Sequence, residues 1–448
     1  TGLLLALAAT LARTLLPAAS SLLPGTLATR GLLLLGRGLG YLLSFLLCAF
    51  WVSLVHQAAL GAVFQHDGPN YRAGLAVLAA IGLPILGYLL LTGRNLDFLN
   101  LSSLHAFYMG RLIRSYLGAA NGQRFGRVAA LGAIEQLPAD MPASPAQIAV
   151  GDQQPDDDVA LDQYLPQRFG GPIHLINACV NQTRDPRGGL FNQDRRGLAL
   201  AVVSGGLMQV SQEGWRPLQG RAAMTLGTWT AISGAAVAPG LGSLTRGGIS
   251  ALATFAGLRL GFWWDKGTRT NAGAAASPLT AKSFGLLRET FGIFRGTERP
   301  DWFLTDGAHF ENSGAYALLA ERAEVVVLAD CGADPAYTFG DVENLVRKAR
   351  IDLQADIFFQ RPKSPPRSAA AAAATAPPAP GSLQQRYRLA KPPAPEPPLW
   401  PAEMDAFGSL NDLASSNSSA CLALATITYG GERPGRGILI LVKPNISD

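Results

Sequence analysis

Two long apolar runs near the start of the chain predict membrane-spanning helices. The first extends from Gly38 to Val55 and lies within a stretch without formal charge. The second extends from Ala73 to Gly93 and is interrupted by Pro84. About 20 apolar residues are enough to cross the hydrocarbon core of a bilayer, so both runs are long enough.

A third candidate span, Leu3–Leu23, is weakened by Arg13 and Pro17. The alternative for all three runs is a set of buried core helices, because hydrophobicity alone does not separate the two cases. A cleaved signal peptide fits less well, since the apolar stretches are long and repeated. We therefore expect residues 1–100 to form a membrane-spanning helical region.

Beyond residue 100 the pattern changes to short apolar runs that alternate with amphipathic or small-residue-rich segments. This alternation is typical of an α/β fold with parallel strands, arranged as a three-layer sandwich. The run Leu252–Trp264 ends in three aromatic residues, which fit either a lipid interface or core packing. Strands are expected at 174–180, 198–203, 324–330 and 437–444, and helices at 104–117, 225–242 and 339–355.

Composition and charge narrow the class of protein. The chain has 448 residues, of which 48% are hydrophobic and 15% are charged, against about 25% charged residues in ordinary soluble domains. The net charge of +5 suits anionic lipid head groups, and no basic stripe with interleaved aromatics suggests nucleic acid as a partner. The four cysteines, Cys48, Cys179, Cys331 and Cys421, are far apart and are expected to be reduced, mostly buried thiols without a metal site.

The placement of arginines predicts an orientation in the membrane. Arg30 and Arg37 flank the first connection, and Arg94, Arg111 and Arg114 follow the last apolar run. By the positive-inside rule the first connection and the large C-terminal region face the cytoplasm. The skew towards Ala, Gly, Leu and Arg suggests a bacterium with GC-rich DNA, and hence its inner membrane.

The segment that begins at Phe303 carries the candidate chemistry. An apolar lead-in ends in Asp306, which is followed at once by Gly307 and Ala308. This is how a buried strand delivers a carboxylate to the rim of a sheet, with room for a neighbouring group to approach. Asp306 is therefore a candidate general base, and the nearby His309 is expected to be a satisfied polar residue. Asp330 also follows an apolar strand and is a rival candidate.

This run resembles the C-terminal half of the catalytic domain of bacterial patatin-like phospholipases. In that family a strand ends in Asp-Gly-Gly or Asp-Gly-Ala, followed by a His-Phe-Glu-Asn stretch, as at Asp306–Asn312. The resemblance implies a three-layer α/β/α patatin-like sandwich and a Ser–Asp dyad, with Asp306 as its base and Gly307 and Ala308 supporting the motif. Further stretches with the family's order and spacing are Leu104–Gly118, His174–Thr183, Asp194–Gly197, Met224–Thr228, Ala231–Ala236 and Gly437–Pro444.

The nucleophile of such a hydrolase is missing from these residues. A G-x-S-x-G elbow does not occur: Ser204 follows Val202-Val203, and Ser233 lacks both outer glycines. We expect the serine and the oxyanion hole in an N-terminal half of the same protein that precedes Thr1, which leaves this chain alone inactive.

The sequence thus predicts a membrane-associated serine-type acyl hydrolase that acts on membrane lipids. No cofactor is expected, and no D-x-[DN]-x-[DN]-G loop supports a calcium requirement. The alternative is a catalytically silent membrane module that keeps the fold for lipid binding or interaction. The expected parts are a membrane region at 1–100, a catalytic domain at 101–361, a Pro/Ala-rich insertion at 362–400 and a final segment at 401–448.

Overall fold

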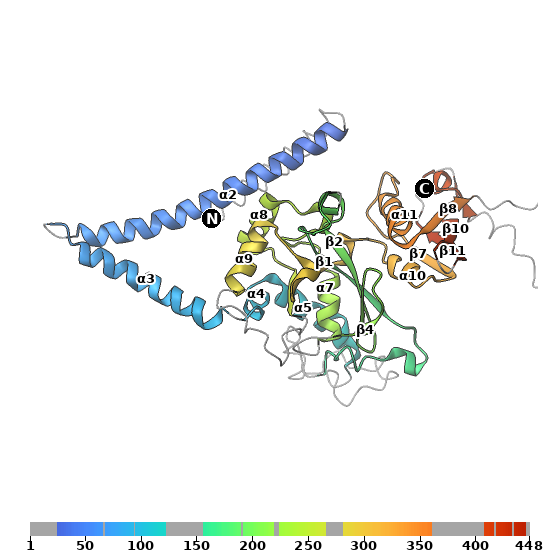
Figure 1. Cartoon of the computed structure of the whole chain (residues 1–448), viewed down its shortest axis with the longest axis horizontal. Coiled ribbons are helices and arrows are strands. Elements are labelled where there is room, and N and C mark those ends of the chain that lie inside the picture. The colour runs from blue at the N-terminus through green and yellow to red at the C-terminus, as the bar shows by residue number, and fades with distance from the viewer. Residues whose placement is uncertain are drawn as a thin grey trace, which may run out of the picture. The chain divides into compact units, whose positions relative to one another are not determined.

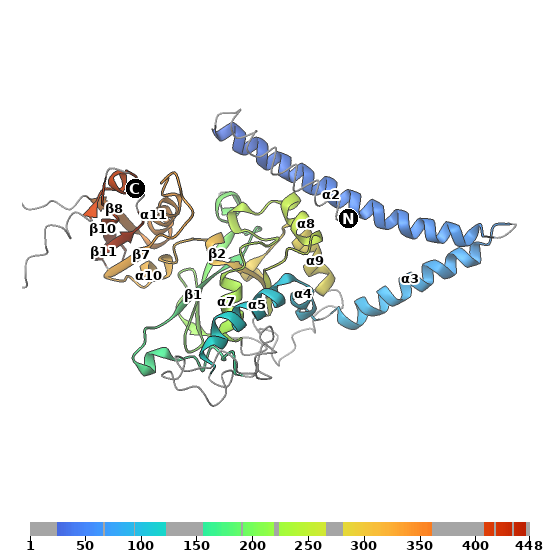
Figure 2. The ribbon, with the colours of Figure 1, turned by 180° about the vertical axis from the view of Figure 1, so that it is seen from behind.

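The computed structural model shows a mixed α/β protein in two compact units (Figures 1 and 2). The first unit comprises Thr1–Phe310 and the second comprises Glu311–Asp448. The structure describes residues 25–65, 68–93, 95–121, 156–189, 191–218, 224–265, 281–360, 407–415, 418–431 and 434–444. The predicted span Leu3–Leu23 and the predicted insertion at 362–400 lie outside these residues.

The two long apolar runs form helices α2 (Gly25–Val63) and α3 (Tyr71–Thr92). The stretches Gly38–Val63 and Tyr71–Thr92 are long and apolar enough to cross a membrane, with mean hydropathies of 2.0 and 2.3. At 1.5 Å per residue they are about 39 and 33 Å long, against about 30 Å for the bilayer core. Where the two helices meet, the Asn70 N–H donates a 2.8 Å hydrogen bond to the Val63 carbonyl, and Asn70 caps α3 by accepting a hydrogen bond from the Ala73 N–H.

The first unit is built around a six-stranded sheet in which every strand runs antiparallel to its neighbours. The strand order is β4-β3-β2-β1-β6-β5. The strands are β1 (Leu175–Asn181), β2 (Gly197–Val203), β3 (Leu207–Val210), β4 (Arg216–Pro217), β5 (Phe262–Asp265) and β6 (Asp301–Asp306).

Short helices surround this sheet. The helix predicted at 225–242 is confirmed for α7, which ends at Ser233, because Gly234 and Pro239 interrupt the segment that follows. The helices of this unit besides α2 and α3 are α4 (Asp97–Leu101), α5 (Leu104–Ser115), α7 (Leu226–Ser233), α8 (Gly247–Phe255) and α9 (Ala281–Phe291). Single turns are η1 (Leu117–Ala120), η4 (Pro166–Phe169), η5 (Phe191–Arg195), η6 (Gly242–Leu244), η7 (Gly296–Glu298) and η8 (Gly307–His309).

Tryptophans dominate the core of this unit. Trp229 on α7 and Trp302 on β6 both pack edge-to-face against Trp264, with ring centroids 5.6 and 5.4 Å apart. Trp263, on the other face of β5, packs on Phe303. Of the two readings of the aromatic run Phe262–Trp264, core packing is therefore the one observed, because both tryptophans are buried.

The second unit holds a smaller sheet in the order β7-β11-β10-β8, with β9 paired to β10. The pairs β7–β11 and β9–β10 are parallel and the others are antiparallel. Its strands are β7 (Val325–Ala329), β8 (Ala355–Gln360), β9 (Phe407–Gly408), β10 (Leu422–Tyr429) and β11 (Gly435–Val442). Its helices are α10 (Tyr316–Ala320), α11 (Gly340–Leu353) and α15 (Leu410–Leu413).

The positions of the predicted elements are confirmed more fully than the directions of the strands. Strands lie at 175–181, 197–203, 325–329 and 435–442, and helices at 104–115 and 340–353, close to the predicted ranges. The prediction of parallel strands is wrong for the six-stranded sheet. An apolar run shows that a strand is buried, whereas the connections between strands set their directions.

Candidate active site

Asp306 is the last residue of β6 and stands at the rim of the six-stranded sheet. It pairs with Ala178 of β1 and begins the single turn η8, whose Ala308 N–H donates a 2.8 Å hydrogen bond to the Asp306 carboxylate. The three apolar neighbours Phe303, Leu304 and Phe310 are all buried. The carboxylate of Asp306 therefore lies at the sheet rim, next to buried apolar side chains.

Burial raises the pKa of Asp306 above the ordinary range of an aspartate. The Ala308 N–H and the nearby His309 act in the opposite direction, but desolvation is the largest cause. A carboxylate with a raised pKa is a stronger proton acceptor when it is ionised, which is the property that a general base requires.

Gly307 is required for a steric reason. A Cβ atom at this position would lie 2.9 Å from the carbonyl oxygen of Asn177 on β1. Gly307 does not have a positive φ, so its backbone conformation does not itself require glycine. The missing side chain instead lets the turn after Asp306 lie directly against β1.

A directed chain of hydrogen bonds fixes His309 beside Asp306. The Gly242 N–H donates to Oδ1 of Asn181, and Nδ2 of Asn181 donates to Oγ1 of the fully buried Thr305 at 2.8 Å. Since Thr305 Oγ1 accepts that bond, its hydroxyl proton is available to Nδ1 of His309 at 2.9 Å. Nε2 of His309 then donates to the Ala236 carbonyl at 3.2 Å.

This chain assigns a neutral tautomer to His309, with the proton on Nε2. Burial lowers the pKa of His309, and the charge on Asp306 opposes this effect. His309 thus ties the turn after Asp306 to the segment after α7. The sequence-based expectation of a satisfied polar residue is confirmed.

Tyr108 is a neighbour of the site that sequence reasoning did not single out. It lies on α5, and a Cβ atom on Gly234 would be 2.4 Å from its hydroxyl oxygen. Burial raises the pKa of Tyr108, and the charge on Asp306 raises it further. Tyr108 is more than 190 positions from Asp306 in the chain, so no local pattern could have linked the two residues.

The two serines considered from the sequence lie in different places. Ser204 follows β2, where its hydroxyl donates to Gln167 at 3.1 Å and accepts from the His174 N–H. Ser204 and Asp306 lie at the ends of strands on opposite sides of β1 and are offset by four residues along it, about 13 Å, so Ser204 is too far away to be the partner of Asp306. Ser233 is the last residue of α7, three residues before the Ala236 carbonyl that His309 contacts.

The rival Asp330 has a structural role in the second unit. Its carboxylate accepts hydrogen bonds from Lys443 Nζ at 2.7 Å and from the Gly332 N–H at 3.1 Å, and Asp330 and Lys443 are both buried. This ion pair joins the end of β7 to the residue after β11. The Asp330 carboxylate is therefore engaged in holding these two strand ends together.

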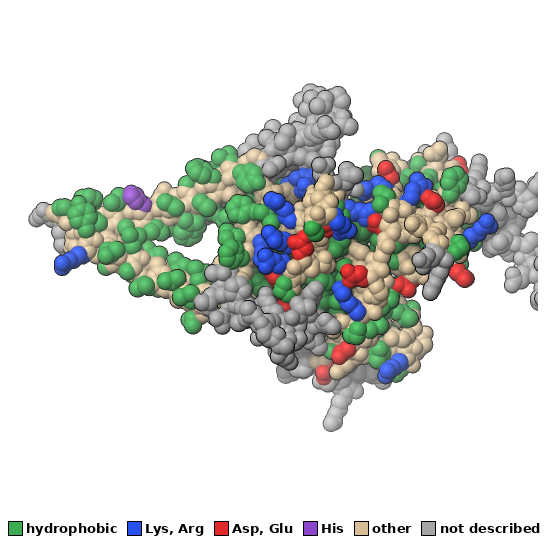
Figure 3. Space-filling view, in the orientation of Figure 1, with side chains coloured by type: hydrophobic (Ala, Val, Ile, Leu, Met, Phe, Trp, Pro, Cys, Tyr) green, Lys and Arg blue, Asp and Glu red, His purple; other side chains and the backbone are tan. Residues whose placement is uncertain are grey.

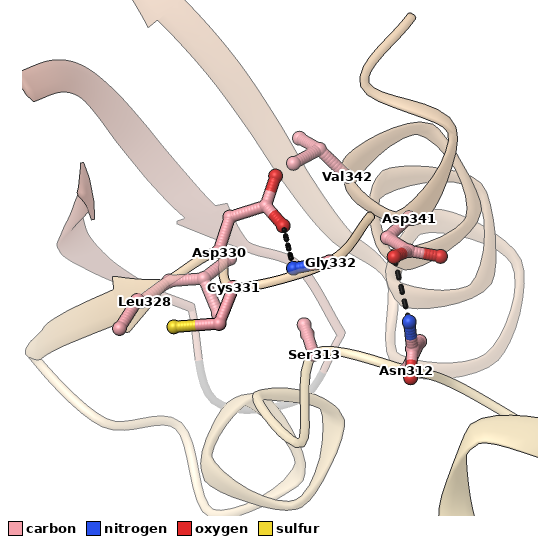
Figure 4. A pocket seen from close by; sticks show the side chains of 9 residues that line it. Asn312, Ser313, Leu328, Asp330, Cys331, Gly332, Asp341 and Val342 are labelled. Atoms are coloured by element: carbon pink, nitrogen blue, oxygen red, sulfur yellow. Dashed lines mark hydrogen bonds between the residues drawn. The ribbon is translucent and has the colours of Figure 1, made fainter. Parts of the chain in front are cut away.

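A small cavity lies beside Asp330 (Figure 4). Its lining includes Cys331 and Asp341, and Asn312 donates a 2.7 Å hydrogen bond to Asp341 across it. The volume is about 230 Å³, below the roughly 300–1,000 Å³ of most small-molecule sites. Among the residues that the structure describes, no group of three His, Cys, Asp or Glu side chains is placed to hold a metal ion.

The cysteines differ in part from the prediction of mostly buried thiols. Cys179 is buried and Cys421 is half-buried, but Cys48 and Cys331 are exposed. All four are free thiols. The two exposed ones follow from their positions, on the outer surface of α2 and in the loop after β7.

Comparison of the chain with protein-family models, with curated proteins and with solved structures finds no match.

Proposed function

We propose that this chain is part of a membrane-associated acyl hydrolase that acts on phospholipids or related lipid esters, with Asp306 as the base of a Ser–Asp dyad. In this proposal the serine and the oxyanion hole belong to a segment outside these 448 residues, and the catalytic unit has the patatin-like three-layer sandwich. The active region faces the cytoplasm.

The observation that carries the proposal is the desolvated carboxylate of Asp306 at the end of a buried strand. Its pKa is raised by burial, and Gly307 allows the turn after it to lie against β1. Perturbed carboxylates at strand ends are frequent in catalytic sites. The resemblance of Asp306–Asn312 to the corresponding family stretch points to the same residue, and two helices long and apolar enough to cross a membrane support a lipid as the substrate.

The chemistry follows from these roles. The serine hydroxyl attacks the ester carbonyl carbon while Asp306 accepts the hydroxyl proton, and backbone N–H groups stabilise the oxyanion. Collapse of the tetrahedral intermediate expels the alcohol, which takes the proton from Asp306. Water then attacks the acyl carbon of the acyl-serine and gives a proton to Asp306. The bond between the serine oxygen and the acyl carbon breaks, Asp306 returns the proton to the serine oxygen, and the fatty acid leaves.

The test is the substitution Asp306→Asn in the full-length protein. Loss of a general base reduces the rate by about 10²–10⁴-fold, so ester hydrolysis should fall by at least about 100-fold. The matched control is Asp356→Asn, which removes an exposed carboxylate in the second unit and should leave the rate unchanged. Activity retained in a folded Asp306→Asn protein would exclude Asp306 as the base.

A further inference from the structure

Helix α9 exposes an apolar face and buries a polar one, the reverse of the usual arrangement in a soluble protein. Its outward side chains are apolar, with exposed fractions of 53% for Phe284, 49% for Leu287 and 55% for Phe291. These three positions have the spacing i, i+3 and i+7, which is one face of a helix. In a water-exposed helix this face would be polar, so the outward apolar stripe requires a partner.

The inward face of α9 is polar because specific partners satisfy it. The carboxylate of Glu289 is fully buried and pairs with the guanidinium of Arg259, and the Trp263 indole N–H donates to it at 2.6 Å. Gly285 lies against α4, since a Cβ atom there would be 2.6 Å from Leu99. This face is therefore fixed towards the protein, and α9 cannot rotate to bury its apolar stripe without breaking these bonds.

The N-terminal end of α9 is tied to the end of α3. The Lys282 N–H donates a 2.8 Å hydrogen bond to the Gly93 carbonyl, directly after the last residue of α3. Its ammonium group contacts Thr92 Oγ1 and lies 3.8 Å from the centre of the Tyr88 ring. The apolar stripe therefore begins where the membrane-crossing stretch of α3 ends.

A second contact joins the neighbouring helix α8 to α2, near the start of the apolar run of α2. A Cβ atom on Gly40 would be 2.0 Å from the Gly248 carbonyl oxygen, so α2 and α8 touch backbone to backbone. Gly40 lies three residues after Arg37, the charged residue that precedes the apolar run of α2. Because α2 and α3 form a hairpin, the start of one stretch and the end of the other lie on the same side of a membrane.

We propose that the apolar stripe of α9 rests in the lipid interface, in the plane of the membrane that α2 and α3 cross. Both anchors place α8 and α9 at the boundary between the membrane-crossing stretches and water. Figure 3 shows hydrophobic side chains on the surface over α8 and α9, between the two long helices. An interfacial helix binds with its apolar side in the boundary between head groups and acyl chains. The partner of this surface is thus the bilayer.

The experiment places a nitroxide on this stripe in the full chain, reconstituted in vesicles of phosphatidylcholine and phosphatidylglycerol. Phe284→Cys and Phe291→Cys are labelled in a background with Cys48→Ala, Cys331→Ser and Cys421→Ser, while the buried Cys179 remains. Phe169→Cys is the matched control, because Phe169 is 91% exposed on η4 in the same unit. Circular dichroism before reconstitution verifies that each variant is folded.

Electron paramagnetic resonance then measures collisions with oxygen, which concentrates in lipid, and with a water-soluble nickel chelate. We expect labels at 284 and 291 to favour oxygen over nickel and the label at 169 to show the opposite order. If the labels at 284 and 291 match that at 169, the stripe faces water and the proposal is wrong. Labels shielded from both reagents would show that a protein surface, such as a second copy of the chain, covers the stripe, which also overturns it.

Discussion

The surroundings of Asp306 disfavour the charged form of its carboxyl group. Buried apolar neighbours raise its pKa, while the fold offers one backbone N–H from Ala308 in return. A group in this position destabilises the folded state whenever it is ionised. Residues of this kind are retained in catalytic sites because the same desolvation increases their basicity.

The first prediction concerns the stability of Asp306→Asn. A carboxyl group whose pKa is raised by folding contributes most to stability below its unfolded pKa of about 4, and this contribution is lost as pH rises through the folded value. Asparagine keeps the acceptor oxygen for Ala308 without the charge. We therefore expect the variant to melt at a higher temperature than the wild type at pH 7, and the difference to shrink as the pH approaches 4. A lower melting temperature at pH 7 would contradict the role of desolvation.

The second prediction concerns His309→Ala. The substitution leaves the hydroxyl of the buried Thr305 without its acceptor, and one unsatisfied buried group costs about 1–3 kcal/mol, whereas Ala236 is exposed and its carbonyl can bind water instead. Urea unfolding should show a loss in this range. The pKa of His309 is lowered by burial, so its contribution is complete above the unfolded value of about 6.5 and is lost as pH falls. The destabilisation by Ala should accordingly diminish between pH 7 and pH 5, and a constant difference would contradict a buried neutral imidazole.

At this scale the sequence indicated the carboxylate but not its surroundings. The apolar run before Asp306 is a local signal, and in the structure it is a buried strand that ends at the carboxylate. Gly307 after it is also a local signal, and in the structure it allows the turn to lie against β1. Tyr108, Asn181 and Ala236 reach the site from other elements. Their positions beside Asp306 depend on tertiary packing, which cannot be predicted from the spacing of residues along the chain.

Among the elements, α9 shows why the local pattern of apolar and polar residues can predict the wrong buried face for a helix. Its buried face contains Lys282 and Glu289, and its exposed face contains phenylalanine and leucine. The partners that satisfy the buried charges, Arg259 and Trp263, come from before residue 266. The sequence instead drew attention to Phe262–Trp264 as a possible interfacial segment, although those tryptophans belong to the core.

The third prediction tests this inward polar face. Removal of one partner from a buried ion pair typically costs about 3–5 kcal/mol, because the other charge is left buried. We expect Glu289→Ala to lower the free energy of unfolding by about this amount, since it strands the Arg259 guanidinium. Glu298→Ala, at an exposed position on η7, should change it by less than about 0.5 kcal/mol. Equal effects of the two substitutions in chemical denaturation would show that Glu289 does not hold α9 in place.

The strand directions are another property of elements that the pattern did not reveal. Continuous apolar runs such as Cys179–Val180 and Leu200–Val203 are typical of strands buried on both faces. Parallel sheets produce this pattern, and so does an antiparallel sheet with side chains packed on both sides. Here Trp229 covers one face and Trp263 and Phe294 lie on the other, which accounts for the pattern in an antiparallel sheet.

In the molecule as a whole, α2 and α3 define the membrane arrangement that we propose. Both helices contain a stretch long and apolar enough to cross a bilayer, and the end of α2 contacts the start of α3, because the Asn70 N–H donates to the Val63 carbonyl. In this proposed arrangement Phe64 and the six-stranded sheet lie on opposite sides of the membrane. The distribution of arginines favours a cytoplasmic position for the large region.

The fourth prediction follows from this hairpin. Phe64→Cys is introduced into a chain from which the other exposed cysteines have been removed. In intact cells this cysteine should react with an impermeant maleimide added outside, because Phe64 is 64% exposed. Phe169→Cys should react only after the membrane is opened. Equal reaction of both positions in intact cells would exclude a hairpin that crosses the membrane.

The central claim, that Asp306 activates a serine for attack on lipid esters, is tested most directly by a fluorophosphonate probe. Such a probe forms a covalent bond with serines that have been activated by a neighbouring base. Membranes that contain the full-length protein should show a labelled band for the wild type and for Asp356→Asn, and no labelled band for Asp306→Asn. Undiminished labelling of a folded Asp306→Asn protein, or labelling that disappears with Ser204→Ala instead, would contradict the proposed dyad.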